Sequence, residues 1–241
     1  MRSRTLLILF SAAAALSLIA FAPLSLLAGE GLASSGVRAR AIDGTIWNGT
    51  LRDAAWRGEP LADVRVRIAP LGLLVGRPGL RFHAKGAALG TGVIEAGRRS
   101  AGLADADLTL PSRLAAPRAP LDGQIVLRDF TARFDRDRCA AARGQARFEV
   151  ARIGGAPAPN VVLSGRPACE GGFLVLPLSG EAQGAKIDAR LRLDGAGRYR
   201  LETRVVTTDA NLGLALGLAG FERTLDGSRR VDEGRIADAD R

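Results

Sequence analysis

Two patterns of hydrophobic and polar residues divide the chain. Residues Thr5–Ala28 form one apolar run of 24 residues without a charge. Beyond it, apolar and polar residues alternate with a period of two, which predicts β-strands with one apolar face and one wet face. We therefore expect a mainly β protein, in which a single N-terminal transmembrane helix is followed by an antiparallel, twisted β-sheet or sandwich with one short C-terminal helix.

The apolar run is long enough to anchor the chain in a membrane. A hydrocarbon core of ~30 Å requires ~20 apolar residues in a helix. Arg2 and Arg4 precede the run and favour a cytoplasmic N-terminus. We expect residues 1–28 to hold the N-terminus and anchor, residues 29–36 to form a linker, and residues 37–241 to form the translocated domain.

A cleaved signal peptide is the alternative to an anchor. Such peptides have an apolar core of ~7–15 residues that ends at a small-x-small cleavage site. The run is longer than that, but Ala20-Phe21-Ala22 inside it fits such a site. Both interpretations deliver the rest of the chain across the membrane.

Two elements near the C-terminus are predicted from turn and cap residues. The sequence Asp194-Gly195-Ala196-Gly197 predicts the loop of a hairpin over Ile187–Val205. Asp209 can cap a helix over Ala210–Ala219 that Gly220 ends. We expect this helix to cover one end of a sheet, with contact to lipid as the alternative.

Glycine and proline also predict the longer connections. The segments 111–120 and 154–160 each contain several prolines and indicate loops. The first loop could divide the domain into two sheets near residues 111–121. Asp122-Gly123 indicates a tight turn.

The charge balance does not indicate a nucleic-acid-binding protein. The chain has a formal net charge of +9, but its arginines are scattered and alternate with aspartates or apolar residues. Such a pattern is typical of solvated strand faces, whereas a nucleic-acid surface needs a basic patch.

Cys139 and Cys169 are the two cysteines of the chain. In an oxidising compartment, two cysteines in a translocated domain usually form a disulfide. Two unpaired buried thiols are the alternative.

The residues that carry most enzyme chemistry are missing. His83 is the single histidine and reads as an exposed strand residue. We find no Gly-x-Ser-x-Gly elbow, no zinc-ligand spacing and no phosphate loop. Asp135 and Asp137 alternate with arginines, which indicates local ion pairs. We expect a protein that is not an enzyme and that uses no cofactor or metal.

The tryptophans lie close to the N-terminal run. Trp47 and Trp56 each lie near a glycine and next to alternating residues, so we expect both rings to be buried against a sheet. Trp47 belongs to Gly44-Thr45-Ile46-Trp47-Asn48-Gly49, which reads as a strand bounded by two glycines. A core tryptophan in an edge hairpin is the alternative.

This stretch resembles the Gly-Thr-aliphatic-Trp-x-Gly signature of protein N of the bacterial type II secretion system. The matching positions are Gly44, Thr45, Trp47 and Gly49. The segment from Tyr199 through the 212–218 helix to Gly220 and Phe221 resembles the family's closing strand–helix–strand, and the cysteine pair in the second half is also similar.

The resemblance implies an accessory component of the type II secretion system in the bacterial inner membrane, with its main domain in the periplasm. Such a component acts by binding other inner-membrane subunits during export of folded periplasmic proteins across the outer membrane. Similar strands occur in AsmA-type envelope proteins, so a periplasmic β-groove protein that handles lipid or lipopolysaccharide is the alternative.

Overall fold

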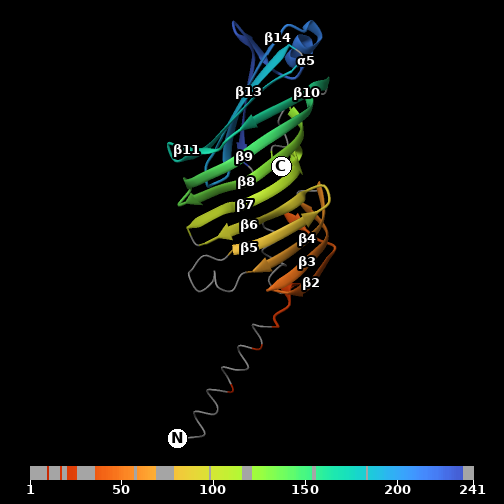
Figure 1. Ribbon diagram of the computed structural model, residues 1–241, viewed down its shortest axis with the longest axis vertical. Coiled ribbons are helices and arrows are strands. Elements are labelled where there is room, and N and C mark those ends of the chain that lie inside the picture. Colours follow the sequence, from red (N-terminus) through yellow and green to blue (C-terminus); the bar gives the residue numbers. More distant parts are fainter. Residues whose placement is uncertain are drawn as a thin grey trace.

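The protein is built on one antiparallel β-sheet of 16 strands, seen along its full length in Figure 1. The computed structural model describes residues 10, 17, 21–25, 36–56, 59–68, 79–97, 99–115, 121–153, 156–182 and 184–235. The prediction of a mainly β, antiparallel protein is confirmed. Strands of the N-terminal half lie across the long axis, whereas β13 and β14 run more nearly along it, so the sheet is strongly twisted.

The strands follow one another closely along the chain. Their bounds are β1 (Val37–Arg38), β2 (Ala41–Thr45), β3 (Asn48–Trp56), β4 (Glu59–Ile68), β5 (Gly79–Lys85), β6 (Leu89–Ala96), β7 (Ser100–Pro111), β8 (Leu121–Asp135), β9 (Arg138–Ile153), β10 (Ala156–Gly165), β11 (Ala168–Glu170), β12 (Phe173–Ala182), β13 (Ala185–Leu193), β14 (Arg198–Thr207), β15 (Glu222–Thr224) and β16 (Gly227–Arg235). The order in the sheet is β1-β3-β4-β5-β6-β7-β8-β9-β10-β12-β13-β14-β16-β15, with β2 on β3 and β11 on β12.

The sheet is continuous across the segment where we expected a possible division. β7 pairs with β8 from Ser100 opposite Asp135 to Pro111 opposite Gln124. A single turn of helix, α4 (Ser112–Ala115), follows β7. The described strands therefore form one sheet and not the two layers of a sandwich.

Apolar side chains of the sheet gather in three clusters that share residues at their borders. The N-terminal cluster contains Leu51 and Val64, and Leu110 packs against both this cluster and the middle one. Ile125 in turn packs against both the middle cluster and the C-terminal one. The apolar side chains thus form a connected core along the sheet.

Three aspartates bend the sheet at β-bulges. Asp53, Asp105 and Asp129 have φ of 46°, 47° and 46°, and each lies where the pairing register shifts. The backbone N–H of Asp105 donates to Thr131 Oγ1 at 3.2 Å. A bulge inserts an extra residue in one strand and increases local bend and twist, so these positions curve the sheet around its apolar side chains.

The C-terminal helix forms as predicted. α5 (Ala210–Leu218) begins after Asp209, whose side chain accepts from the backbone N–H groups of Asn211 and Leu212. Leu212 and Leu216 are buried in the C-terminal cluster. The helix therefore covers one end of the sheet.

The hairpin at the C-terminal end is confirmed, and two local predictions are wrong. β13 and β14 pair from Ala185 opposite Thr207 to Leu193 opposite Tyr199. Asp122-Gly123 is not a turn but lies within β8 at a register shift. The expected loop 154–160 is shorter, because β10 already begins at Ala156. Pro157 and Pro159 therefore lie within β10, where its pairing with β9 shifts register.

Most of the apolar N-terminal run lies outside the described residues, as does most of the segment 29–36. Within the part of the chain that is described, no helix combines the length and apolar character needed to cross a membrane. Phe21–Ser25 are described, and Ala22, Pro23 and Leu24 among them contact the first strands of the sheet.

We expect Thr203→Val to stabilise the protein. Thr203 is fully buried, and its hydroxyl has no hydrogen-bond partner among the described residues. Because an unsatisfied buried polar group costs about 1–3 kcal/mol, removing it should raise the free energy of unfolding by about 1 kcal/mol, measured by urea denaturation.

Thr131→Val is the matched control. Thr131 is also buried, but its hydroxyl accepts from Asp105 N and from Arg143 Nε, each at 3.2 Å. Its replacement leaves two donors without their acceptor and should destabilise the protein. Destabilisation by both substitutions would contradict the assignment of Thr203 as unsatisfied.

Candidate interaction site

The Gly44–Gly49 segment is a β-hairpin, which was the alternative to the single strand that we expected. Thr45 pairs with Asn48 and Gly44 pairs with Gly49, so Ile46 and Trp47 alone form the turn between β2 and β3. The centre of the turn contains no glycine, proline or asparagine, which explains why no turn was predicted at Ile46 and Trp47.

Both glycines of the hairpin lie so close to other atoms that a side chain would not fit at either position. Gly44 has φ of +92°, and a Cβ there would lie 2.4 Å from the backbone oxygen of Asn48. A Cβ on Gly49 would lie 2.3 Å from Leu24 Cδ2. Gly44 therefore permits the backbone turn, and Gly49 makes room for a side chain from the end of the N-terminal run.

That end of the run is bound to the hairpin by its backbone and by one side chain. Ile46 N donates to Ala22 O at 3.1 Å, and Pro23 forms an isolated bridge with Thr45. Leu24 is buried in the N-terminal cluster. Sequence reasoning assigned Leu24 to the membrane anchor, whereas the structure places its side chain in the core of the domain.

The prediction of two buried tryptophan rings is wrong. Trp47 and Trp56 are both half-buried, and the three apolar clusters formed by described residues do not include them. Trp47 lies at the turn of the hairpin, and Trp56 lies at the opposite end of β3.

Gly220 and Phe221 end the C-terminal helix. Gly220 has φ of +80° and donates its N–H to Gly217 O at 3.1 Å, while Phe221 N donates to Leu216 O at 3.0 Å. This pair of bonds is a Schellman motif. Phe221 and Leu216 share the C-terminal cluster, so both motif residues serve the fold and lie at the end of the sheet opposite the hairpin (Figure 1).

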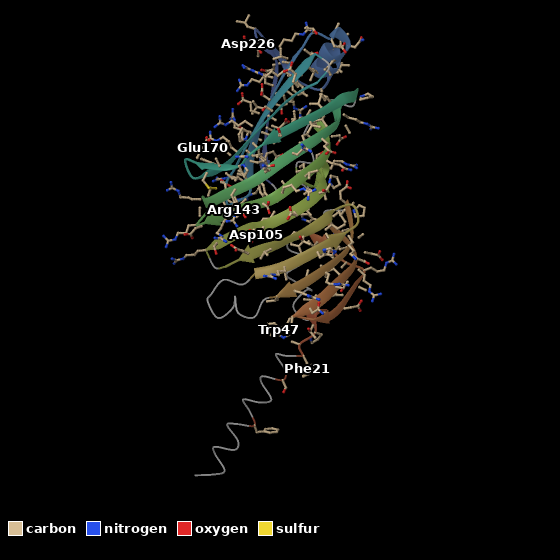
Figure 2. All side chains as sticks on the ribbon, in the orientation of Figure 1. Phe21, Trp47, Asp105, Arg143, Glu170 and Asp226 are labelled. Atoms are coloured by element: carbon tan, nitrogen blue, oxygen red, sulfur yellow. A yellow bond between two sulfur atoms is a disulfide. The ribbon has the colours of Figure 1, made fainter. Side chains whose placement is uncertain are left out.

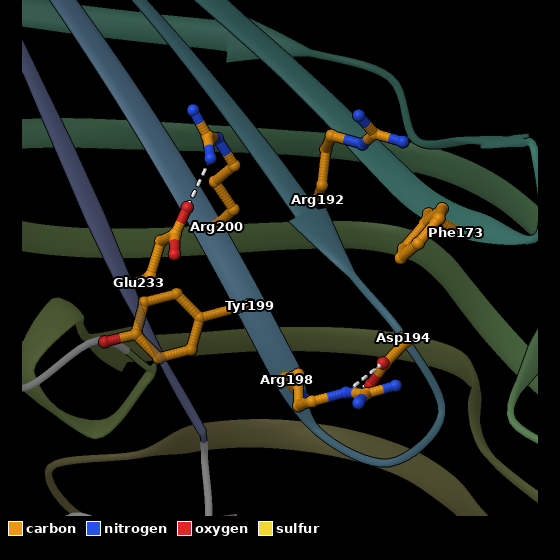
Figure 3. A pocket seen from close by; sticks show the side chains of 7 residues that line it. All are labelled: Phe173, Arg192, Asp194, Arg198, Tyr199, Arg200 and Glu233. Atoms are coloured by element: carbon orange, nitrogen blue, oxygen red, sulfur yellow. Dashed lines mark hydrogen bonds and ion pairs between the residues drawn. The ribbon is translucent and has the colours of Figure 1, made fainter.

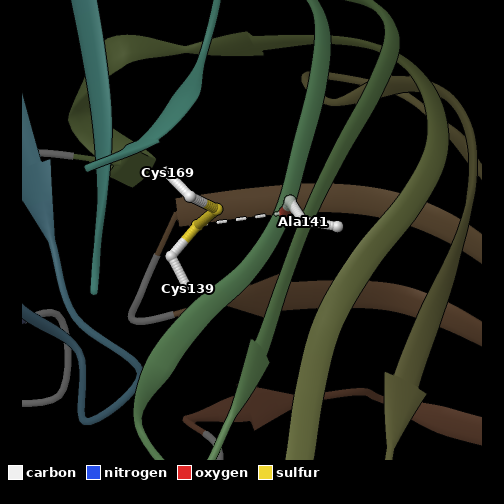
Figure 4. The surroundings of a disulfide bond; sticks show 3 residues. All are labelled: Cys139, Ala141 and Cys169. Atoms are coloured by element: carbon white, nitrogen blue, oxygen red, sulfur yellow. Dashed lines mark hydrogen bonds between the residues drawn. A yellow bond between two sulfur atoms is a disulfide. The ribbon is translucent and has the colours of Figure 1, made fainter. Parts of the chain in front are cut away.

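The disulfide between Cys139 and Cys169 is present and links β9 to β11, with Cα atoms 5.5 Å apart (Figure 4). Cys139 N donates to Gly172 O at 2.8 Å, and Gly195 N donates to Asp137 O at 3.0 Å. The bond therefore lies where three turns of the sheet meet. The ion pairs expected for Asp135 and Asp137 are not among those of the described residues.

Two shallow hollows lie over β13, β14 and their neighbours. One has a volume of about 470 Å³ and is lined by Arg190, Arg192, Arg200 and Glu202. The second, of about 330 Å³, is lined by Phe173, Arg192, Asp194, Arg198, Tyr199, Arg200 and Glu233 (Figure 3). Both are rich in charged side chains.

The charges around the hollows are largely paired. Arg190 forms an ion pair with Glu170 at 2.7 Å, and Arg200 forms one with Glu233. The Arg192 guanidinium lies over the Phe173 ring, 4.7 Å from its centroid. A nearly neutral, polar surface of this kind suits contact with a protein better than capture of an anion.

Asp194, which lines the second hollow, has a pKa below its ordinary value of 3.8. Burial raises the pKa of Asp194. Hydrogen bonds from the Arg198 side chain and backbone lower it by more than burial raises it, so the pKa of Asp194 is depressed. The Arg198 N–H and Nε donate at 2.9 and 2.7 Å. The pair closes the β13–β14 loop and leaves Asp194 an acceptor at neutral pH.

The remaining candidates for chemistry are dispersed. His83 is half-buried in β5, opposite Arg65 and Thr91. No group of three or more His, Cys, Asp or Glu residues that could hold a metal ion occurs among the residues described. That the protein is not an enzyme stays a prediction.

Comparison of the sequence with models of known protein families identifies the family of this chain. A family model described as type II secretion system (T2SS), protein N, matches residues 35–232. The chain belongs to this family. Searches of curated proteins and of solved structures gave no match.

Family membership makes the protein a component of the type II secretion system, with a role among the other subunits of that machinery. The matched range contains the hairpin, the disulfide and α5. It begins after the N-terminal apolar run.

We expect Gly44→Ala to destabilise the protein N domain by about 1–3 kcal/mol, because it combines positive φ with a backbone clash. Gly171→Ala is the control: Gly171 has φ of +59°, but a Cβ there meets nothing within 4 Å. Thermal melting should show a clearly larger loss for Gly44→Ala. Equal losses would mean that the close approach at Gly44 is relaxed at little cost.

We expect loss of the disulfide to destabilise the domain by about 3–4 kcal/mol, from the loop that it closes in the unfolded chain. The sequence separation of 30 residues sets this value. The double variant Cys139→Ser/Cys169→Ser should melt at lower temperature, and the native protein should resist alkylation until it is reduced. Two thiols that react without reductant would refute the bridge.

Proposed function

We propose that this protein is an accessory inner-membrane subunit of the type II secretion system that acts by binding other inner-membrane subunits. The observation that carries the proposal is the family match over residues 35–232. The N-terminus is cytoplasmic, the apolar run crosses the inner membrane once, and the sheet lies in the periplasm.

The N-terminal sequence supports this topology. Arg2 and Arg4 precede an uncharged run that is long enough to span a bilayer. The disulfide between Cys139 and Cys169 also suits an oxidising compartment such as the periplasm.

The C-terminal edge of the sheet supports a binding role. β15 pairs with β16 only from Gly227 to Arg229, whereas β14 pairs with β16 as far as Arg235. On the side away from β14, residues 230–235 therefore have no neighbouring strand among the described residues. A row of unpaired backbone groups accepts an extended segment of a partner by strand addition.

The other edge is less accessible to a partner. β1 and β2 both pair with β3, at its two ends, and Pro23 bridges Thr45 of β2. We therefore assign partner binding to β16.

The lipid-handling alternative has less support. A lipid groove needs an apolar hollow, whereas the two hollows described above are lined largely by arginines and acidic residues. The apolar side chains of the sheet pack against one another in connected clusters. The two functions also predict different phenotypes.

The test is a deletion strain assayed for export of folded periplasmic proteins. Full-length protein should restore export, and an anchorless form should restore less, because anchoring raises the effective concentration of neighbours in the same membrane. Normal export together with a weakened outer-membrane lipid barrier in the deletion strain would refute the proposal and favour lipid handling.

Val231→Lys tests the strand edge within the same assay. Val231 lies on β16 and is 37% exposed, whereas Val162 lies on the central strand β10 and is 42% exposed. An edge lysine opposes strand addition, so Val231→Lys should reduce export and Val162→Lys should not. Equal export by the two variants would refute the assignment to β16.

A further inference from the structure

The end of the N-terminal run is divided between solvent and the core of the domain. Phe21 is 77% exposed, whereas Leu24, three positions later, is 9% exposed and packs with Leu51 and Val64. Between them, Ala22 and Pro23 are bound to the β2–β3 hairpin. The domain therefore begins at Ala22, inside the apolar run.

This boundary matches the dimensions of a bilayer. The residues from Thr5 to Ala22 number 18, which as a helix span about 27 Å. A hydrocarbon core is ~30 Å thick. If this part of the run crosses the membrane, the hairpin that holds Ala22 lies at the membrane surface.

The hairpin presents an aromatic side chain at this place. Trp47 and Phe21 are the chain neighbours of Ile46 and Ala22, which are joined by the 3.1 Å hydrogen bond, and Figure 2 labels both where the chain enters the sheet. Trp47 is half-buried at the turn. Aromatic side chains with a polar atom are enriched at the headgroup level of membranes, because one end of the ring is apolar and the other is wet.

Two arginines lie beside the turn. Arg67 and Arg81 are exposed and directly opposite each other on β4 and β5, and Arg67 Nε donates to Asn48 Oδ1 at 3.2 Å. Neither forms an ion pair with a carboxylate of the described chain. Like charges directly opposite each other are destabilising, and an anionic group placed between them would relieve the repulsion.

The spacing of the strands keeps these arginines near the turn. β4 and β5 are the first and second neighbours of β3, and neighbouring strands lie ~4.8 Å apart. The backbones at Arg67 and Arg81 are thus displaced from β3 by one and two strand spacings, which is at most about 10 Å across the sheet. Phosphates of anionic lipids attract basic side chains over this range.

We infer that the Ile46–Trp47 turn, with Phe21, Arg67 and Arg81, seats the sheet on the periplasmic surface of the inner membrane. Trp47 lies among the headgroups, and the two arginines bind anionic headgroups. The inference rests on the proposed membrane anchor and adds a defined orientation: the first strands face the lipid, and β13 and β14 lie at the far end (Figure 1).

The two tryptophans provide a reporter and its control. In full-length protein in vesicles of phosphatidylethanolamine and phosphatidylglycerol, Trp56→Phe leaves Trp47 as the sole tryptophan, and Trp47→Phe leaves Trp56. Lipids brominated near the headgroup should quench Trp47 strongly, and lipids brominated deep in the acyl chain should quench it less. Trp56, at the other end of β3, should show no such loss of fluorescence.

The arginines are tested with the Trp47 reporter. Quenching should fall when phosphatidylcholine replaces phosphatidylglycerol, and Arg67→Gln/Arg81→Gln should abolish this dependence on anionic lipid. Arg166→Gln/Arg223→Gln, which removes two exposed arginines of the C-terminal half, should keep it. The same dependence in both double variants would overturn the role of Arg67 and Arg81.

Flotation of the vesicles distinguishes failure of the seated turn from failure of the membrane anchor. Protein that floats with the vesicles but shows equal quenching of Trp47 and Trp56, or none, overturns the seated turn and leaves the anchor intact. Protein that does not float refutes the anchor and, with it, this inference. Export by the secretion assay tests the binding role independently.

Discussion

A single layer of β-sheet has to bury its own apolar face, and this requirement shapes the molecule. α5 covers only the C-terminal end, where Leu212 and Leu216 enter the core. Along the rest of the sheet, curvature brings apolar side chains of different strands together. The bulges at Asp53 in β3, Asp105 in β7 and Asp129 in β8 supply bend and twist. The clusters remain connected through residues that border two of them.

The regular parts of this architecture follow from the sequence, and the irregular parts do not. Alternation identified the strands, and Asp209 with Gly220 identified the helix, because those signals act within a few residues. The bulges were missed since Asp105 reads as one more outward polar residue in the Ala104–Leu110 alternation. Its left-handed φ is accompanied by a hydrogen bond from its N–H to Thr131 of the next strand, and a contact between strands is not visible in one local pattern.

In the candidate site, too, local sequence signals predicted some features, whereas features that depend on distant residues were missed. The family motif was recognisable from Gly44, Trp47 and Gly49, and the cysteine pair predicted the bond that is present. The role of Gly49 was hidden, because it depends on Leu24, a residue 25 positions earlier that reads as part of a membrane helix. The half-burial of Trp47 was likewise missed, since a tryptophan in an alternating segment looks like core until the turn is placed.

The strand order has a consequence for how the protein reaches its folded state. Nearly every strand pairs with the one before it or the one after it in the chain, so most contacts close short loops at low entropic cost. A chain delivered N-terminus first can therefore add its strands one at a time, each using the preceding strand as a template. Until the β15–β16 hairpin pairs with β14, the newest strand is always an open edge, and mispairing with another chain is the hazard of that interval.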